Sequence, residues 1–171
     1  MTNKLRRSTK LWIGLFMSII MYYLIHEGAH LIQAVLADNF DYIRFVGIIG
    51  IEIMIKEVPT GLELAMFSGL SSVLTILLGY LLVAIMPKIL GLKSKTMKVI
   101  FYYTTIVFLV LDPLYMSILH RFVGGGDMNG VSKGLGISSF PVSLVFGILF
   151  IINLYIAIKK VNPAYKRNFL Q

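Results

Sequence analysis

The chain has 171 residues, of which 57% are hydrophobic and only 14% are charged, and it contains no cysteine. Soluble domains carry about 25% charged residues, so this composition excludes an ordinary water-soluble globule. The absence of cysteine also excludes disulfides and thiolate ligands. A net charge of +8 favours nucleic acid in a soluble protein, but no binding motif accompanies the charge here, and we expect no nucleic-acid partner.

Four apolar runs are long enough to cross a bilayer, because a hydrocarbon core of about 30 Å takes roughly 20 helical residues. The runs are Leu11–Ala37, Leu62–Met86, Val99–Leu119 and Ile137–Ile158. The first run is too long for the core of a signal peptide and no cleavage pattern follows it, so we expect a permanent helix. The sequence predicts an all-α membrane protein with about four transmembrane helices, which form a single integral membrane domain over residues 1–171.

The segment between the first two runs has a different character. It reads "FDYIRFVGIIGIEIMIKEVPTG", with β-branched and aromatic residues in short stretches that are interrupted at Gly47 and Gly50 and closed by Pro59 and Gly61. This pattern predicts a β-hairpin. Open strand edges cannot face hydrocarbon, so we expect the hairpin at the membrane interface or against helices. An amphipathic surface loop is the alternative interpretation.

The first run contains three ionisable residues, His26, Glu27 and His30, in "MYYLIHEGAHLIQAVLA". On an α-helix, residues four apart lie on one face about one turn apart, so both imidazoles can reach a single ion. This is the H-E-x-x-H arrangement, in which two neutral imidazoles bind zinc and the glutamate acts as general base toward a water on the metal. Ionisable groups are costly in a membrane, which makes a polar cluster without metal the weaker interpretation.

A catalytic zinc takes three protein ligands and keeps one open position. Without cysteine, the third ligand must be His120 or a carboxylate. Asp127 lies in "GGGDMNG", where the preceding glycines permit positive φ and a close approach to another helix, so that an irregular segment presents the carboxylate inward. Asp112 lies in the third run before the helix-disturbing Pro113, and its burial also needs a reason. For His120, at a helix end, an exposed or capping role is expected.

Together these motifs resemble the site-2 protease family of intramembrane zinc metalloproteases. "HEGAH" matches the family's H-E-x-x-H, "YIRFVGIIGIEIMI" is similar to its strand-rich segment, "FSGLSS" weakly resembles its small-residue turn, and "GGGDMNG" is similar to its later Asp-Gly motif. The likeness covers about Leu11–Ile158. The resemblance implies a Zn²⁺ cofactor held by His26, His30 and Asp127, with Glu27 as catalytic base.

The last motif departs from the family pattern. Two residues separate Asp127 from the next glycine, and the proline that the family places in this stretch stands back at Pro113. Asp112 therefore remains an alternative third ligand.

Basic residues gather before the first run, between the second and third runs, and after the last. They are Lys4, Arg6, Arg7 and Lys10, then Lys88, Lys93, Lys95 and Lys98, and finally Lys159, Lys160, Lys166 and Arg167. The positive-inside rule predicts that both termini are cytoplasmic. We expect a multi-pass protein of a bacterial-type cell membrane. This orientation places "HEGAH" near the outer end of its helix, whereas well-known members of the family carry their site nearer the cytoplasmic face.

The resulting hypothesis is an enzyme, a zinc metallopeptidase that hydrolyses a peptide bond in or near a transmembrane segment. Its partners would be the lipid bilayer, a membrane-protein or lipid-adjacent peptide substrate, and a regulatory membrane protein. The alternative is a non-catalytic membrane metal-binding protein, either a zinc transporter component or a pseudoprotease-type regulator. A transporter would be expected to show ligands on several helices and symmetric halves, which the sequence lacks. Tyr22 and Tyr23 are expected to be interfacial or packing aromatics.

Overall fold

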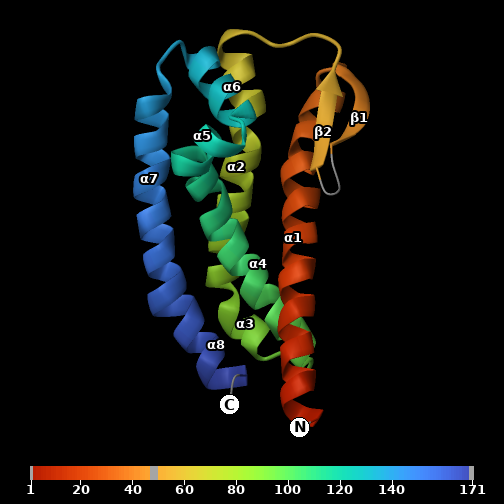
Figure 1. The fold of residues 1–171 in the computed structure, drawn as a ribbon, viewed down its shortest axis with the longest axis vertical. Helices are drawn as coiled ribbons and strands as arrows, with labels where there is room; N and C mark the ends of the chain where they lie inside the picture. The colour runs from red at the N-terminus through yellow and green to blue at the C-terminus, as the bar shows by residue number, and fades with distance from the viewer. Residues whose placement is uncertain (1, 47–49, 170–171) are drawn as a thin grey trace.

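The computed structural model describes residues 2–46 and 50–169. The helices run along the long axis of the molecule, and a two-stranded hairpin lies beside one of them (Figure 1). Four helical stretches are long and apolar enough to cross a membrane, namely Ser8–Leu36, Gly61–Ala84, Lys95–Val123 and Ser139–Asn168. This confirms the predicted all-α fold with about four spanning helices.

The elements follow one another in a simple order. They are α1 (Thr2–Leu36), β1 (Phe40–Val46), β2 (Gly50–Ile55), α2 (Gly61–Ala84), α3 (Met86–Leu90), α4 (Lys95–Leu114), α5 (His120–Val123), α6 (Gly126–Leu135), α7 (Ser139–Ile156) and α8 (Asn162–Phe169). The π-helical turns η1 (Tyr115–Leu119) and η2 (Ala157–Val161) join α4 to α5 and α7 to α8. The prediction of an irregular segment around Asp127 is wrong, because this residue lies in the first turn of α6.

The predicted β-hairpin is confirmed. β1 and β2 pair antiparallel, with Arg44 opposite Glu52, and the two side chains form an ion pair. β2 is the strand that packs more closely on α1, so the hairpin lies against a helix as the cost of open strand edges requires. Gly47, where the sequence predicts an interruption, lies outside the described residues.

Small residues allow the spanning helices to approach closely around α4, which contacts α1, α2 and α7. A Cβ at Gly14 of α1 would lie 2.5 Å from the Val99 side chain of α4, and one at Gly79 of α2 would lie 3.1 Å from Leu109. Close packing of this kind holds helices together in lipid, where burial of apolar surface supplies little net driving force.

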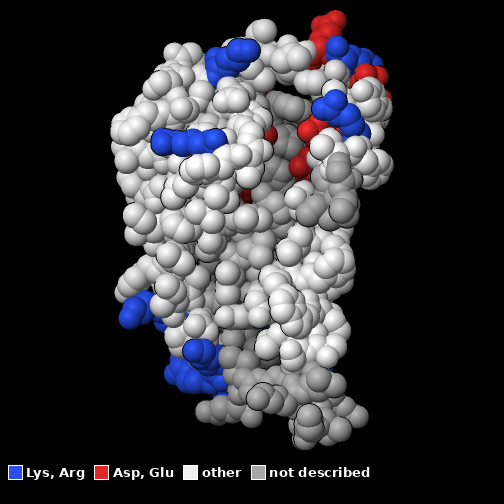
Figure 2. All heavy atoms as spheres, in the orientation of Figure 1, with Lys and Arg blue, Asp and Glu red and all other residues white. Residues whose placement is uncertain are grey.

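The outer surface suits a bilayer. The middle of the face in Figure 2 carries no charged side chains, and lysines and arginines lie towards the two ends. Both termini and α3 lie at one end of the molecule, whereas the hairpin and α6 lie at the other (Figure 1). The three basic segments thus share one end. Their assignment to the cytoplasmic side, and the bacterial type of the membrane, remain predictions.

Helix α4 continues through Pro113 instead of ending there. Proline has no N–H, so the carbonyl of Leu109, one turn earlier, loses its helical donor. Asn153 of α7 replaces it, because its Nδ2 donates to the Leu109 oxygen at 2.7 Å from a fully buried position. Ser117 Oγ in turn donates to the Pro113 carbonyl at 2.6 Å. These bonds keep the chain around Asp112 helical and buried.

Candidate metal centre

His26 and His30 lie on one face of α1, as their spacing predicts. Their ring centroids are 5.3 Å apart, and the side chains are only 7% and 8% exposed. The Nε2 atoms of both rings lie near the Ser71 hydroxyl of α2, at 3.0 Å for His30 and 3.4 Å for His26. Both imidazoles therefore present the same nitrogen to one small space between helices.

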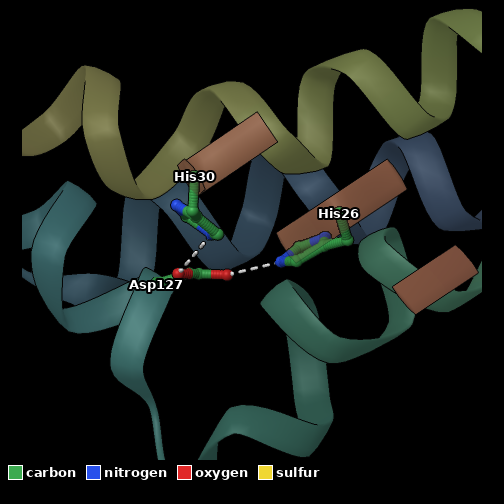
Figure 3. Close-up of side chains that lie close together, drawn as sticks. All are labelled: His26, His30 and Asp127. Atoms are coloured by element: carbon green, nitrogen blue, oxygen red, sulfur yellow. Dashed lines mark hydrogen bonds and ion pairs between the residues drawn. The ribbon is translucent and has the colours of Figure 1, made fainter. Parts of the chain in front are cut away.

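Asp127 reaches this space from α6. Its Oδ2 lies 3.1 Å from His26 Nε2 and its Oδ1 lies 3.5 Å from His30 Nε2 (Figure 3). Burial by itself raises the pKa of Asp127, but hydrogen bonds with the two histidines outweigh burial and lower this pKa to about 2. The carboxyl group is therefore ionised at neutral pH, which is the form that binds a cation.

Glycines bring α6 to this position. Gly124, in the connection from α5, has a φ of 90°, which favours glycine. Within α6, Gly130 packs on the Ser68 side chain and Gly134 packs on the backbone of Ala65, so closely that a Cβ at either glycine would collide with α2. The sequence predicted that glycines before Asp127 would allow both a positive φ and a close approach to another helix. In the structure Gly124, before Asp127, has the positive φ, whereas Gly130 and Gly134, after it, allow the close approach.

The three side chains could hold a metal ion. Their ligand atoms all lie within 4.8 Å of one another, and His26, His30 and Asp127 are the group of this kind within the described residues. Atoms bound to one tetrahedral zinc at about 2.0–2.2 Å lie roughly 3.4 Å apart, close to the distances seen here. His120 is not part of the group; it stands at the C-terminal end of η1 as a helix-end residue, but it is buried rather than exposed.

Glu27 lies beside the cluster without belonging to it. It is half-buried, and within the described part of the chain it makes no hydrogen bond or ion pair. Figure 2 shows acidic side chains inside a hollow between the hairpin and the helices, and Asp127 is itself 21% exposed. Water can therefore reach this part of the molecule.

Asp112 occupies the other side of His26. Its Oδ1 lies 3.3 Å from His26 Nδ1 and accepts hydrogen bonds from Tyr22 Oη at 2.7 Å and Ser72 Oγ at 3.3 Å. Its Oδ2 accepts a hydrogen bond from the Thr75 hydroxyl. The residue is fully buried and is not part of the group that can hold an ion. The structure thus places Asp127, and not the alternative Asp112, with the two Nε2 atoms.

Several residues of this region escaped the sequence analysis. Tyr22 was expected to be an interfacial or packing aromatic, and it is buried against the rings of Tyr23 and His26, but the hydrogen bond from its hydroxyl to Asp112 was missed. Ser71 and Ser72 were quoted only within "FSGLSS", without a role at the site, and Thr75 was not identified. Their signal is a row of small hydroxyl side chains on one face of an otherwise apolar helix, and the signal of Tyr22 is its place one turn before His26.

A cavity of about 1010 Å³ opens between the C-terminal end of α1, residues 56–60 and the first half of α2. Phe67 lines this cavity, and its ring centroid lies 5.1 Å from that of His30, so one aromatic ring separates the cavity from the metal centre. The side chains around it are both polar and apolar, and they include Gln33, Asn39, Glu63, Met66 and Leu70.

Comparisons of the chain with protein-family models, with curated proteins and with solved structures return no significant match. What the protein does must therefore be inferred from the geometry and chemistry of its own residues.

Proposed function

We propose that this protein is a zinc-dependent intramembrane endopeptidase that hydrolyses a peptide bond in or near a transmembrane segment of a substrate protein, with Glu27 as general base. The observation that supports this most directly is the meeting of His26 and Asp127, which are 101 residues apart in the chain, beside His30. Ionisable residues within a membrane are costly, and a functional site is their default explanation.

The chain's own residues have separate roles in this proposal. His26, His30 and Asp127 hold the ion. Zinc, when bound, would polarise the scissile carbonyl and lower the pKa of water toward about 7. Glu27 takes a proton from the attacking water and gives it to the leaving amine, so that a C–O bond forms as the C–N bond breaks. Its carboxylate suits this role because no hydrogen bond within the described chain occupies it.

The cavity next to Phe67 is the place that we propose for the substrate. Met66 and Leu70 supply apolar side chains, which suit a segment taken from a membrane. A helix uses its carbonyl groups internally, so the substrate must unwind locally before one of them can be attacked. The cavity lies at the hairpin end of the molecule, which the predicted orientation places on the outer side of the membrane.

The substitution Glu27→Gln tests the proposal, because glutamine keeps the shape of the side chain and cannot take a proton. Zinc-loaded protein in detergent is incubated with a set of single transmembrane peptides, and products are identified by mass spectrometry. We expect cleavage to fall by about 10²–10⁴-fold, with one zinc per chain retained. Asp41→Asn, an exposed carboxylate on β1, is the matched control and should cleave normally.

The outcomes separate the alternatives. A wild-type protein that binds zinc and cleaves none of the peptides would favour the non-catalytic metal-binding protein. Full activity in Glu27→Gln would remove the general base from the proposal, and a folded wild-type protein that binds no zinc would contradict both functions.

A further inference from the structure

We infer that Asp112 is a positioning residue that holds the His26 ring so that its Nε2 faces the metal. This inference depends on the metal centre of the proposed function. The two nitrogens of His26 face two different carboxylates, with Nε2 at 3.1 Å from Asp127 Oδ2 and Nδ1 at 3.3 Å from Asp112 Oδ1. Asp127 therefore faces the nitrogen on the side of the metal centre, and Asp112 faces the other nitrogen of the same ring.

The chemistry of imidazole makes this arrangement directional. A neutral imidazole has one nitrogen that donates and one that accepts, whereas an ionised carboxylate only accepts. Both oxygens of Asp112 accept hydrogen bonds from hydroxyl groups, so Asp112 acts as an acceptor toward Nδ1 and favours the proton there, which leaves the lone pair on Nε2 free for an ion. Metal-binding histidines commonly donate their other N–H to a carboxylate or carbonyl, which fixes the orientation of the ring and makes the binding nitrogen more basic.

The same geometry prevents Asp112 from being the third ligand. The ring nitrogens point in different directions, and the ion shared with His30 and Asp127 would lie on the Nε2 side. Asp112 lies on the Nδ1 side. An ion held by the three-residue group is therefore beyond its reach.

Hydroxyl donors hold Asp112 in place. Tyr22 and Ser72 donate to its Oδ1, and Thr75 donates to its Oδ2, so that three donors from α1 and α2 surround a fully buried carboxylate of α4. Hydrogen bonds of this kind compensate the cost of burying a charge. The carboxylate is thus fixed where three spanning helices meet, which gives His26 a rigid support.

His30 lacks this support. Its Nδ1 has no hydrogen-bond partner within the described residues, although it is buried. Removing the negative charge of Asp112 should therefore change His26 and leave His30 as it is. This asymmetry distinguishes a positioning role from general damage to the fold.

The test uses the substitution Asp112→Asn in the full chain in detergent, with Zn²⁺ affinity measured by competition with a chelator. Asparagine keeps the shape and one accepting oxygen but loses the charge, so we expect zinc affinity to fall by about 10–100-fold. Asp127→Asn, which removes a ligand, should cause a larger loss. Thr104→Val, a buried residue of α4 whose hydroxyl has no partner in the described chain, is the control and should bind zinc normally.

A second measurement reports on His26 alone. The chain has only three histidines, so ¹⁵N-histidine labelling gives a spectrum that single substitutions can assign. We expect a low-field Nδ1–H proton on His26 in the zinc-loaded wild type, which moves upfield or is lost in Asp112→Asn while the His30 signals stay. An unchanged zinc affinity, or an unchanged His26 proton, would overturn the inference.

If Asp112→Asn does not fold, Tyr22→Phe keeps the inference testable. The Tyr22 hydroxyl donates to Asp112 Oδ1 and also lies 3.4 Å from His26 Nδ1. Its removal leaves Asp112 as the acceptor near that nitrogen in the described chain, so the His26 proton should move further downfield, with zinc retained. An upfield shift would contradict the inference. A wild type that binds zinc but cleaves nothing would refute the peptidase and leave the role of Asp112 standing.

Discussion

Packing against an aromatic ring, rather than a hydrogen bond to Nδ1, orients His30. Its Nδ1 has no partner within the described residues, and the Phe67 ring lies 5.1 Å away in a tilted arrangement. Aromatic pairs contribute about 0.5–1.5 kcal/mol beyond the area they bury, which corresponds to roughly 2–12-fold in an equilibrium constant. The position of His30 should therefore depend on Phe67.

We expect Phe67→Ala to weaken zinc binding by roughly 2–12-fold because the His30 ring gains freedom. Chelator competition on protein that elutes as folded by size exclusion measures the effect. Phe16→Ala, at a ring of α1 that is 65% exposed, is the control and should leave zinc affinity unchanged. Equal affinity in Phe67→Ala and wild type would mean that Ser71 alone holds the ring.

The histidine pair could be predicted from the sequence because its geometry is local. Residues four apart on a helix share a face whatever the rest of the chain does, so the placement of His26 beside His30 required no tertiary information. The carboxylates differ in this respect. Asp127 follows three glycines and Asp112 precedes a proline, so the sequence favours an unusual backbone at both. Only the packing of α4 and α6 decides which nitrogen of His26 each carboxylate meets.

The docking of α6 on α2 determines whether Asp127 reaches the histidines. A Cβ at Gly134 would collide with the backbone of Ala65, and backbone atoms cannot move aside as a flexible side chain can. Overpacking of this kind costs about 1–3 kcal/mol or shifts the element. We expect Gly134→Ala to displace α6, which moves Asp127 away from the two histidines and lowers zinc affinity.

The measurement is again zinc affinity by chelator competition, together with thermal unfolding. Gly126→Ala is the matched control in the same helix, because a Cβ at Gly126 meets nothing within 4 Å. If Gly134→Ala bound zinc as the wild type does, the close approach of α6 and α2 would not be needed for the metal centre.

One buried amide links α7 to α4 by a hydrogen bond. Asn153 donates to the Leu109 carbonyl that Pro113 leaves without a helical donor, and it accepts a hydrogen bond from the Tyr80 hydroxyl at 2.5 Å. Replacing it by leucine leaves a buried carbonyl and a hydroxyl unpaired. We expect Asn153→Leu to lower the free energy of unfolding by about 1–2 kcal/mol.

Unfolding in mixed detergent and dodecyl sulfate micelles measures this change. Asn168→Leu is the control, because the Asn168 amide donates to Ala164 from an exposed position where water can replace the bond. Equal losses in the two variants would show that the buried amide has no special role.

Elements could be predicted from the sequence where one property dominates them. Long apolar runs predict the spanning helices, and alternating β-branched residues predict the hairpin. Helix α6 has neither signal, since three of its ten residues are glycine. It is helical because Gly130 and Gly134 fit against α2, and packing of that kind overrides a poor intrinsic propensity.

The whole molecule is polarised along its long axis. The metal centre, the hairpin and the cavity lie towards the end opposite to both termini (Figure 1). In the proposed function, the orientation of the bundle therefore decides whether a substrate would be cut near the outer or the inner face of the membrane. The basic residues of the two termini and of the connection between α2 and α4 predict that their end is cytoplasmic.

Single cysteines can test this orientation directly, because the chain has none of its own. Thr60, at the hairpin end, and Lys93, in the connection before α4, are both exposed. We expect a membrane-impermeant maleimide on intact cells to label Thr60→Cys and not Lys93→Cys, and to label both after permeabilisation, which also shows that each site is accessible. The reverse pattern would place the metal centre near the cytoplasmic face, as in well-known members of the site-2 protease family, and would mean that lysines and arginines do not determine the topology of this bundle.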